Sequence, residues 1–433
     1  MGLNVEILPF RGLRYNPQKI SCIGQVIAPP YDVIKDEQRV TLERQHANNV
    51  VRLILSQPYE KDTDTHNQYT RTAENLRNWI SERVLIQDAS PNYYVYDQSF
   101  TTPDGQAFTR RALVGVGKLH PFGAGMVFPH EKTLAAPKAD RLNLLRACHA
   151  NLSPIFLLYS DPSGEIEKSI VHFTSSVRPL IDVQEVFGST HQLWRLDDAA
   201  AIREIRSAFE DKSLVIADGH HRYETALAFR DELREQALEW TGEEDYNYMM
   251  MNLVRMESPG LVVLAIHRLL SGLSADRITQ AIKQLPESFD VTIHANQRAL
   301  LENLHALAGT CTAFGMYTGD GNYRLLVPRV SDETKPPVSK RLDVTLLHAR
   351  LIKNGFGIDT TIPSHQTQVS YTVNTHEAIR YVKDGEGRVA LLMNPTLVSQ
   401  VNEAATDNKT MPQKSTYFYP KMATGLVFNL LNS

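Results

Sequence analysis

Apolar residues recur along the chain with two periodicities, one typical of helices and the other of strands. Residues 69–84 repeat apolar positions about every three to four residues, which predicts an amphipathic helix. Short apolar runs bounded by polar residues predict buried strands. By these criteria we expect helices at residues 37–46, 69–84, 138–150, 198–209, 223–236 and 275–285, and strands at residues 50–55, 93–100, 111–119, 155–159, 192–196, 213–217 and around Val291.

Turn-forming residues indicate how some of these segments connect. Residues 102–105, with the sequence Thr-Pro-Asp-Gly, lie between two strand segments and predict a hairpin. Residues 246–256 and 261–266 are expected to form a second pair of strands. Beyond His267 and Arg268 the pattern changes character, so we place a domain boundary near residue 270.

Composition limits the classes of protein that fit. The 433 residues are too many for one comfortable core, so we expect two or three domains. With 45 Lys and Arg against 49 Asp and Glu, the formal net charge is −4. This balance argues against sequence-independent binding of nucleic acid, because that mode needs a surplus of cations.

The cysteines and the N-terminus indicate a compartment. The 3 cysteines lie far apart and form no C-x-x-C pair, which favours a reducing environment. The N-terminus lacks a basic region followed by an apolar stretch, and no apolar run reaches the length of a membrane span. We therefore expect a cytoplasmic protein with neither a membrane nor a nucleic-acid partner; its oligomeric state is left open.

The strongest chemical signal is the sequence Ala-Asp-Gly-His-His-Arg-Tyr at residues 217–223, where a predicted strand runs into a predicted helix. Gly219 allows a sharp turn, and the free N–H groups of a first helical turn favour an anion. His221 and Arg222 add donors, and an arginine can hold a phosphate through two hydrogen bonds. Asp218 and His220 are the candidate catalytic groups. The structural alternative is that the aspartate caps the helix and the histidines only pack.

A second signal follows residue 128. His130 and Glu131 precede a Lys-Thr pair, and Lys138 and Arg141 open a predicted helix. In this combination Glu131 suits acid–base chemistry, and His130, Lys138 and Arg141 suit phosphate binding. It is not the His-Glu-x-x-His zinc motif, because position 134 is Leu. The alternative is a solvated charged loop.

A third signal lies near the C-terminus, at residues 411–421. Its Lys-Ser-Thr run resembles the end of a Walker loop, but the preceding glycines are missing, so a nucleotide loop of that kind is not supported. Lys414, Ser415, Thr416 and Lys421 could still cover a phosphorylated ligand. The alternative is a C-terminal strand packed by its aromatic residues.

A fourth candidate is Asp32, which follows two prolines and a tyrosine on a stiffened segment. Its carboxylate could act as a base or as a metal ligand. An ordinary turn residue is the alternative.

Five segments together resemble an uncharacterised bacterial family, the domain-of-unknown-function family ten-fifteen. These segments span nearly the whole chain, and they are residues 28–33, 130–133, 151–156, 217–223 and 411–416. The resemblance implies no settled activity.

The Asp-Gly-His-His-Arg segment also resembles the ParB/sulfiredoxin superfamily, through elements around residues 27–55 and 214–235. In that superfamily a Gly-x-x-Arg helix start lies against nucleotide phosphates, which implies this role for Gly219, His220, His221 and Arg222. The chain has His220 where sulfiredoxins have a catalytic cysteine. No helix-turn-helix signature follows residue 236, so the branch that remains is the free-serine kinases.

The two resemblances imply an α+β fold. A ParB/sulfiredoxin-like domain would occupy residues 1–270, with a β-rich insertion near residues 90–200. A smaller α/β domain would occupy residues 271–433, and its tail at residues 411–421 could return to the site.

The leading interpretation is a nucleotide-dependent phosphotransferase that acts on a small hydroxyl or phosphorylated metabolite. ATP or ADP would be the nucleotide, and Mg²⁺ would bridge its phosphates. A carboxylate, from Asp32, Glu131 or Asp218, would accept the hydroxyl proton. The family resemblance implies serine or phosphoserine as a candidate substrate.

Two other functions remain open. One is a metal-dependent phosphohydrolase, in which a metal ion would be held by His130, Glu131, Asp218, His220 and His221. The other is a non-enzymatic module that binds a nucleotide and signals this binding to a partner through domain closure.

Overall fold

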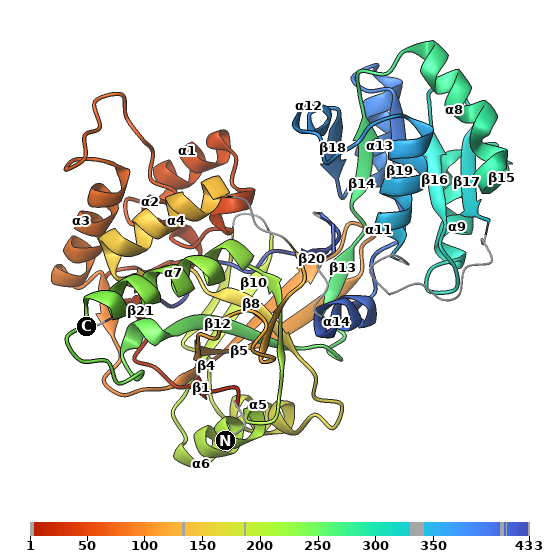
Figure 1. Ribbon diagram of the computed structural model, residues 1–433. Helices are drawn as coiled ribbons and strands as arrows, with labels where there is room; N and C mark the ends of the chain where they lie inside the picture. The colour runs from red at the N-terminus through yellow and green to blue at the C-terminus, as the bar shows by residue number, and fades with distance from the viewer. Residues whose placement is uncertain are drawn as a thin grey trace. The chain divides into compact units, whose positions relative to one another are not determined.

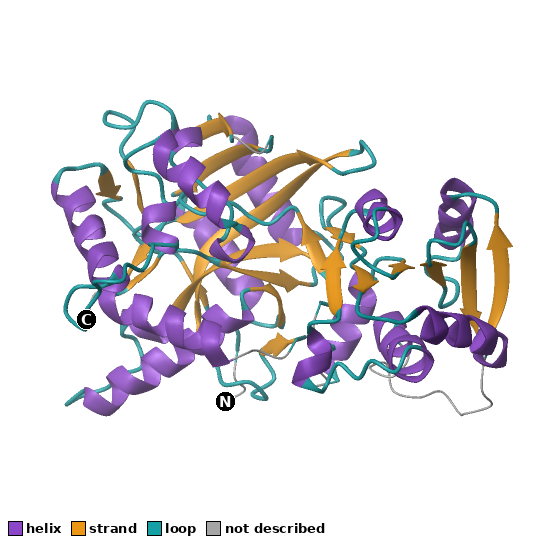
Figure 2. Ribbon diagram, turned by 90° about the horizontal axis from the view of Figure 1, so that it is seen from above, coloured by secondary structure: helices purple, strands orange, loops and turns teal. Residues whose placement is uncertain are grey.

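The chain divides into two compact units. The computed structural model describes residues 4–131, 135–185, 188–329, 342–407, 411–412 and 414–431. Unit 1 comprises residues 1–129, 133–261 and 420–433, and unit 2 comprises residues 130–132 and 262–419. The chain therefore leaves unit 1 after Leu261 and rejoins it at Pro420. Both units combine sheets with helices (Figure 1, Figure 2).

The helices of unit 1 largely follow the sequence pattern. They are α1 (Asp36–Gln45), α2 (Val51–Ile54), α3 (Gln68–Ser81), α4 (Ala135–Cys148), α5 (Glu165–Ser176), α6 (Ala199–Phe209) and α7 (His220–Gln236), with short turns of 3-10 helix at η1 (Ile23–Gln25), η2 (Tyr31–Val33) and η3 (Asp245–Asn247). Residues 50–55 were expected as a strand, and that prediction is wrong because they contain α2. The Asn49 side chain accepts a hydrogen bond of 2.9 Å from the N–H of Val51, the first residue of this helix.

The main sheet of unit 1 has the strand order β6-β11-β8-β12-β5-β4-β10-β9, with β1 also paired to β5. Its strands are β1 (Ile7–Leu8), β4 (Tyr93–Thr101), β5 (Ala107–Lys118), β6 (Val127–Pro129), β8 (Ile155–Tyr159), β9 (Ile181–Gln184), β10 (Thr190–Leu196), β11 (Leu214–Asp218) and β12 (Tyr248–Arg255). β4 and β5 form the predicted antiparallel hairpin. The β6–β11 and β8–β12 pairs are parallel.

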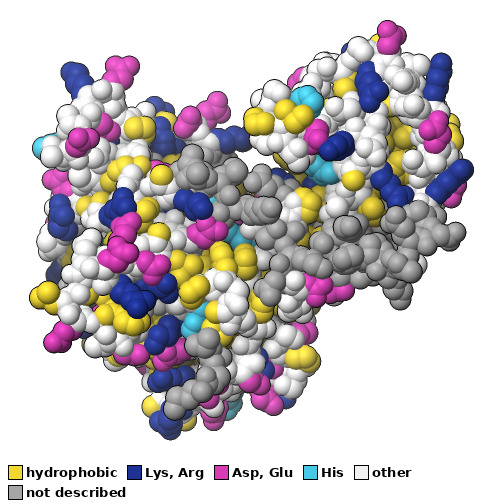
Figure 3. Space-filling view, in the orientation of Figure 1, with side chains coloured by type: hydrophobic (Ala, Val, Ile, Leu, Met, Phe, Trp, Pro, Cys, Tyr) yellow, Lys and Arg dark blue, Asp and Glu magenta, His cyan; other side chains and the backbone are white. Residues whose placement is uncertain are grey.

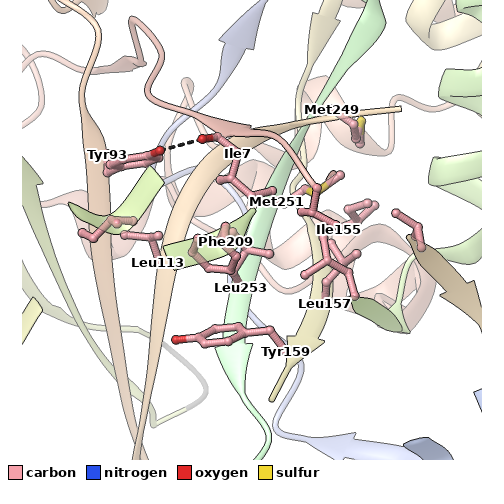
Figure 4. Packing of buried hydrophobic residues seen from close by; sticks show 14 of the residues in the cluster. Ile7, Tyr93, Leu113, Ile155, Leu157, Tyr159, Phe209, Met249, Met251 and Leu253 are labelled. Carbon is pink, nitrogen blue, oxygen red and sulfur yellow. Dashed lines mark hydrogen bonds between the residues drawn. The ribbon is translucent and has the colours of Figure 1, made fainter. Parts of the chain in front are cut away.

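Alternate residues of the central strands build the core of unit 1. Met249, Met251 and Leu253 of β12 face the same cluster as Ile155 and Leu157 of β8 (Figure 4). The cluster also takes in side chains from α5, α6 and α7. Because α7 is packed into this cluster, its first turn is held firmly at the end of β11.

The C-terminal segment of unit 1, residues 420–431, contacts β12 at Asn252, which alternates with the core residues Met251 and Leu253. Asn252 donates a hydrogen bond of 3.0 Å to Met422 Sδ. Further along, the segment exchanges backbone hydrogen bonds with Ala28 and Leu13, and β21 (Asn429–Leu430) pairs with β7 (Ala150–Asn151). A second small pair joins β2 (Leu13–Tyr15) to β3 (Leu85–Gln87). Residues 420–431 are thus an integral part of unit 1.

Unit 2 is built on an antiparallel sheet with the order β15-β17-β16-β19-β14-β18. The strands are β14 (His267–Leu270), β15 (Phe289–His294), β16 (Phe314–Tyr317), β17 (Tyr323–Pro328), β18 (Val369–Thr372) and β19 (Val389–Met393). The helices are α8 (Ala275–Ser288), α9 (Gln297–Ala306), α11 (Asp343–Leu346), the π-helical η4 (Leu347–Gly355), α12 (Pro363–Gln366), α13 (Thr375–Lys383) and α14 (Val398–Thr406). β13 (Val262–Leu264) pairs with β20 (Tyr417–Tyr419), so the expected pairing of residues 261–266 with residues 246–256 is wrong.

The surface carries mixed charge. On the face drawn in Figure 3, Lys and Arg side chains are interspersed with Asp and Glu. In the part of the chain that the structure describes, we find no helix with the length and apolarity needed to cross a bilayer.

Gly219 is the backbone pivot between β11 and α7. Its φ is +99°, in the left-handed region that favours glycine. A Cβ atom at this position would lie 2.8 Å from Ile155 Cγ2 in the packed core and 3.0 Å from Arg222 Nη2. The turn therefore requires glycine for two reasons, conformation and space.

We expect Gly219→Ala to lower the free energy of unfolding by about 2–4 kcal/mol, from the left-handed conformation and the collision with Ile155 together. Gly105→Ala is the matched control, because Gly105 has a φ of +87° but open space around it. The control should cost only about 1 kcal/mol. Urea denaturation of both variants measures the difference. Equal losses would contradict the close packing at Gly219.

Candidate functional site

The strand-to-helix junction places the motif residues inside the helix. α7 begins at His220, three positions before the expected start at residue 223, so His220, His221 and Arg222 form its first turn. Tyr223 anchors this turn, because its side chain is fully buried and its hydroxyl donates a hydrogen bond of 2.9 Å to the His120 carbonyl. The first-turn N–H groups of a helix of this length carry partial positive charge.

Asp218 lies between two cations. Lys421 Nζ contacts Asp218 Oδ1, and Arg222 Nη2 donates a hydrogen bond of 2.8 Å to Oδ2. The three side chains are only 11–14% exposed. Burial by itself would raise the pKa of Asp218, but the charges of Lys421 and Arg222 outweigh it and lower this pKa to about 2. The carboxylate is therefore ionised at neutral pH.

Two side chains from the β4–β5 hairpin hold Lys421 in place. Gln98 Nε2 donates a hydrogen bond of 3.1 Å to the Lys421 carbonyl. Arg110 Nη2 lies 2.5 Å from both Gln98 Oε1 and the Pro420 carbonyl. Arg110 is completely buried, and burial lowers its pKa to about 10.

Sequence reasoning missed Gln98 and Arg110. A signal was present, because a strand that carries Arg110 and Arg111 in succession points a charge at each of its faces. Arg111 pairs with Asp97, at 2.6 Å. Arg110, on the opposite face, therefore needs a polar partner of its own, and the Pro420 carbonyl of the C-terminal segment supplies one.

His221 lies at the edge of this group of charges. Burial lowers the pKa of His221, and the neighbouring Lys138 and Arg222 act in the same direction, while Glu224 and Asp32 oppose them. Its imidazole is consequently neutral at neutral pH. Lys138 and Glu224 form an ion pair at 2.7 Å, and Asp32 is exposed in η2.

Arg141 and Tyr31 form a further part of the site in unit 1. The Arg141 guanidinium lies 4.0 Å from the centroid of the Tyr31 ring. It also donates hydrogen bonds of 2.8 Å to the Ile54 carbonyl and to Asp140 Oδ2. Arg141, Tyr31 and Arg222 line a cavity of about 50 Å³ beside the helix start.

The first residues of the second signal and part of the third signal come together in unit 2. His130 Nε2 lies 2.9 Å from Thr416 Oγ1, and the Lys414 N–H donates a hydrogen bond of 3.3 Å to Glu131 Oε1. The Ser415 carbonyl accepts a hydrogen bond of 2.8 Å from Thr396. Lys132 and Thr133, which belong to the same signal, lie outside the described residues.

The structure thus sorts the candidates into two sets. In unit 1 lie Asp32, Lys138, Arg141, Asp218, Gly219, His220, His221, Arg222 and Lys421; in unit 2 lie His130, Glu131, Lys414, Ser415 and Thr416. Over the described ranges, no three His, Cys, Asp or Glu side chains are placed to share a metal ion. Within unit 1, this holds for Asp218, His220 and His221.

The fold and this junction define a mixed α/β protein with a cation-rich helix start. The chain belongs to the family "Protein of unknown function (DUF1015)", whose model matches residues 7–345, as the five motif segments predicted.

Three similar solved structures share little sequence with the chain. A free serine kinase in complex with AMP is 12% identical, with a TM-score of 0.31, over 67% of this chain and 83% of that chain. SbnI with a C-terminal truncation, from Staphylococcus aureus, is 10% identical, with a TM-score of 0.33, over 70% and 84%. A conserved hypothetical protein from Pyrococcus furiosus is 14% identical, with a TM-score of 0.30, over 69% and 92%. No curated protein matches the sequence.

We expect Lys421→Met to raise the pKa of Asp218, because it removes one of the two cations that stabilise the carboxylate. The folded pKa of Asp218 lies below its ordinary value, so the ion pair contributes stability above about pH 4 and loses that contribution as the pH falls toward 2. The variant should therefore lose less stability than the wild type across this window. Carboxyl ¹³C NMR titration and acid denaturation measure the two effects.

Lys138→Met is the control for that experiment, since Lys138 pairs with Glu224 instead. It should leave the titration of Asp218 unchanged. An Asp218 pKa that is the same in Lys421→Met and in the wild type would show that the tail lysine does not govern this carboxylate.

Proposed function

We propose that unit 1 binds the phosphate groups of a nucleotide at the start of α7 and transfers a phosphoryl group between that nucleotide and a small hydroxyl compound. The observation that carries the proposal is the convergence of Arg222 and Lys421 on Asp218, at the end of β11 and just before the first turn of α7. First-turn N–H groups, a guanidinium and an ammonium together attract phosphate oxygens. Phosphoryl transfer needs mainly such positioning and charge neutralisation.

Asp218 acts in this proposal as a positioning residue. Both of its oxygens are engaged by cations, and its low pKa makes it a weak proton acceptor at neutral pH. It holds Arg222 and Lys421 in a fixed geometry before the ligand arrives, which lowers the entropic cost of binding phosphate.

His221 is the group best suited to accept the hydroxyl proton. Its imidazole is uncharged at neutral pH, and it occupies the same helical turn as Arg222. As the hydroxyl oxygen bonds to phosphorus, the bond from phosphorus to the leaving oxygen of the nucleotide breaks. The proton of the hydroxyl passes to an imidazole nitrogen.

Mg²⁺ commonly binds through one or two carboxylates together with substrate phosphates. In this site Asp32 is the exposed carboxylate, and it is close enough to influence the pKa of both His221 and Tyr31. Asp218 fits the ion poorly, because Arg222 and Lys421 already engage its two oxygens. When bound, the ion would neutralise charge on the phosphates.

We expect Arg222→Met to weaken the binding of ADP by about 10- to 100-fold, because a hydrogen bond to a charged group contributes about 1.5–3 kcal/mol. Isothermal titration calorimetry with ADP and AMP, with and without Mg²⁺, measures the affinity. Arg230→Met is the control on the same helix, since Arg230 pairs with Asp231 and donates to the Leu119 carbonyl. Equal affinities in the two variants would remove the phosphate role from Arg222.

We expect phosphoryl transfer to decline at acidic pH as His221 becomes protonated. Because the pKa of His221 lies below its usual 6.5, the decline should have its midpoint below pH 6.5. His221→Asn should lower kcat by about 10²- to 10⁴-fold and remove this acidic limb. ³¹P NMR of ATP with a panel of small alcohols, serine and phosphoserine among them, measures turnover. An acidic limb that persists in the variant would assign the proton transfer to another group.

A further inference from the structure

β15 ends the sheet of unit 2, and among the described residues no strand lies on its outer side. It pairs with β17 alone (Figure 1). It has 6 residues, whereas β6, β9 and β18, which end the strand orders of the two large sheets elsewhere, have 3, 4 and 4. Its sequence, Phe-Asp-Val-Thr-Ile-His, contains no lysine or proline. A long edge strand without these residues is a template for pairing with another strand.

The hydrogen bonds of the sheet show which backbone groups of β15 point outward. The Arg329 N–H donates a hydrogen bond of 3.0 Å to the Ser288 carbonyl, and this pair continues the β15–β17 register. Hydrogen-bonded and non-hydrogen-bonded positions alternate along antiparallel strands. Residues 290, 292 and 294 therefore bond to β17, whereas Val291 and Ile293 point their N–H and C=O groups to the outer edge. Within the described ranges these four groups have no hydrogen-bond partner.

The side chains of the same two residues make one face of this edge apolar. Ile293 is 61% exposed, and Val291 is half-buried. They lie on the same face of the strand because they are two positions apart. The outer edge thus offers a second strand both backbone hydrogen bonds and an apolar contact.

We propose that two copies of the chain pair through β15, antiparallel about a twofold axis at Thr292. In this register Val291 of each copy is opposite Ile293 of the other, so all four outward groups of each copy find partners. Thr292 is opposite itself. Asp290 is opposite His294, so two carboxylates do not meet. Pairs of β-branched residues and Thr–Thr pairs are favourable across antiparallel strands.

The two neighbouring registers satisfy the backbone less well. With the axis at Val291, Ile293 would be opposite Phe289, whose N–H already donates a hydrogen bond at the end of α8. With the axis at Ile293, Val291 would be opposite Ala295, which lies beyond the end of the strand. The axis at Thr292 therefore gives the most complete pairing. Because both copies use the same edge, the assembly closes at two.

Sedimentation equilibrium of the full chain over a range of concentrations tests the dimer. A single pair of short strands is a small interface, so we expect the wild-type dimer to dissociate on dilution. Ile293→Lys should weaken dimerisation about tenfold, because each dimer loses two apolar cross-strand pairs and gains a charge on each edge. Ile362→Lys is the matched control, since Ile362 is an isoleucine of unit 2 that is 43% exposed outside β15. It should leave dimerisation unchanged.

A disulfide tests the register. Residues opposite each other at a non-hydrogen-bonded position have Cα atoms about 4.5 Å apart, which a disulfide can span. Thr292→Cys should therefore cross-link the dimer on mild oxidation, in a chain whose exposed Cys22 and Cys311 are replaced by serine. Asp290→Cys is the control, because its two copies would lie four residues apart along the strands, about 13 Å.

The proposal is overturned if the wild type remains a monomer at every concentration, or if Ile293→Lys dimerises as strongly as Ile362→Lys. Equal cross-linking of Thr292→Cys and Asp290→Cys would also reject it, because disulfides formed by random collision do not depend on register. Both lysine variants change exposed side chains, so neither should disturb the fold. The proposal does not rest on the proposed function, and loss of ADP binding would leave it intact.

Discussion

The site in unit 1 depends on the pairing of one buried carboxylate, Asp218, with two cations. A buried charge is costly unless it is paired and hydrogen bonded, and here a cation contacts each oxygen. Arg222 comes from the helix that follows Asp218, whereas Lys421 comes from the C-terminal segment, 203 residues later. The ion pairs therefore join the β11–α7 junction to the last part of the chain, and loss of either cation would leave one oxygen of the carboxylate without a cationic partner.

Sequence patterns could predict the parts of this site but not their assembly. The β11–α7 junction and the β4–β5 hairpin were predicted because each depends on residues that are close in sequence. An apolar run before a glycine indicates the junction, and turn residues indicate the hairpin. The contact of Asp218 with Lys421 depends on Gln98 and Arg110, which hold the backbone of residues 420–421. No local pattern links residues so distant in the chain, so the sequence could name Asp218 and Lys421 as candidates without showing that they are paired.

The three errors in the predicted elements have three separate physical causes. Residues 50–55 are apolar and few, and such a run is buried equally well as a strand or as a helical turn. In the structure these residues form a helical turn, and the Asn49 side chain accepts a hydrogen bond from the N–H of its first residue, Val51. Residues 261–266 have strand character, but their partner, β20, lies more than 150 residues away, and periodicity carries no information about which strand pairs with which. The start of α7 was placed too late because Gly219 and two histidines were taken as loop, whereas the glycine turns the chain before the helix begins.

In the proposed function, the distribution of charge in unit 1 separates the groups that bind a phosphate from the group that accepts a proton. Arg222 and Lys421 contact both oxygens of Asp218 and keep the carboxylate ionised. Asp218 can therefore position these two cations, but it accepts a proton poorly. His221 lies in the same first turn of α7 as Arg222. Burial, together with the neighbouring cations, nevertheless keeps its imidazole uncharged. Burial is the main reason that protonation of the imidazole is disfavoured; Lys138 and Arg222 add to it, whereas Glu224 and Asp32 oppose it. In the proposed function, the imidazole keeps its free electron pair mainly because it is partly buried, so it can act as a base although cations lie close to it.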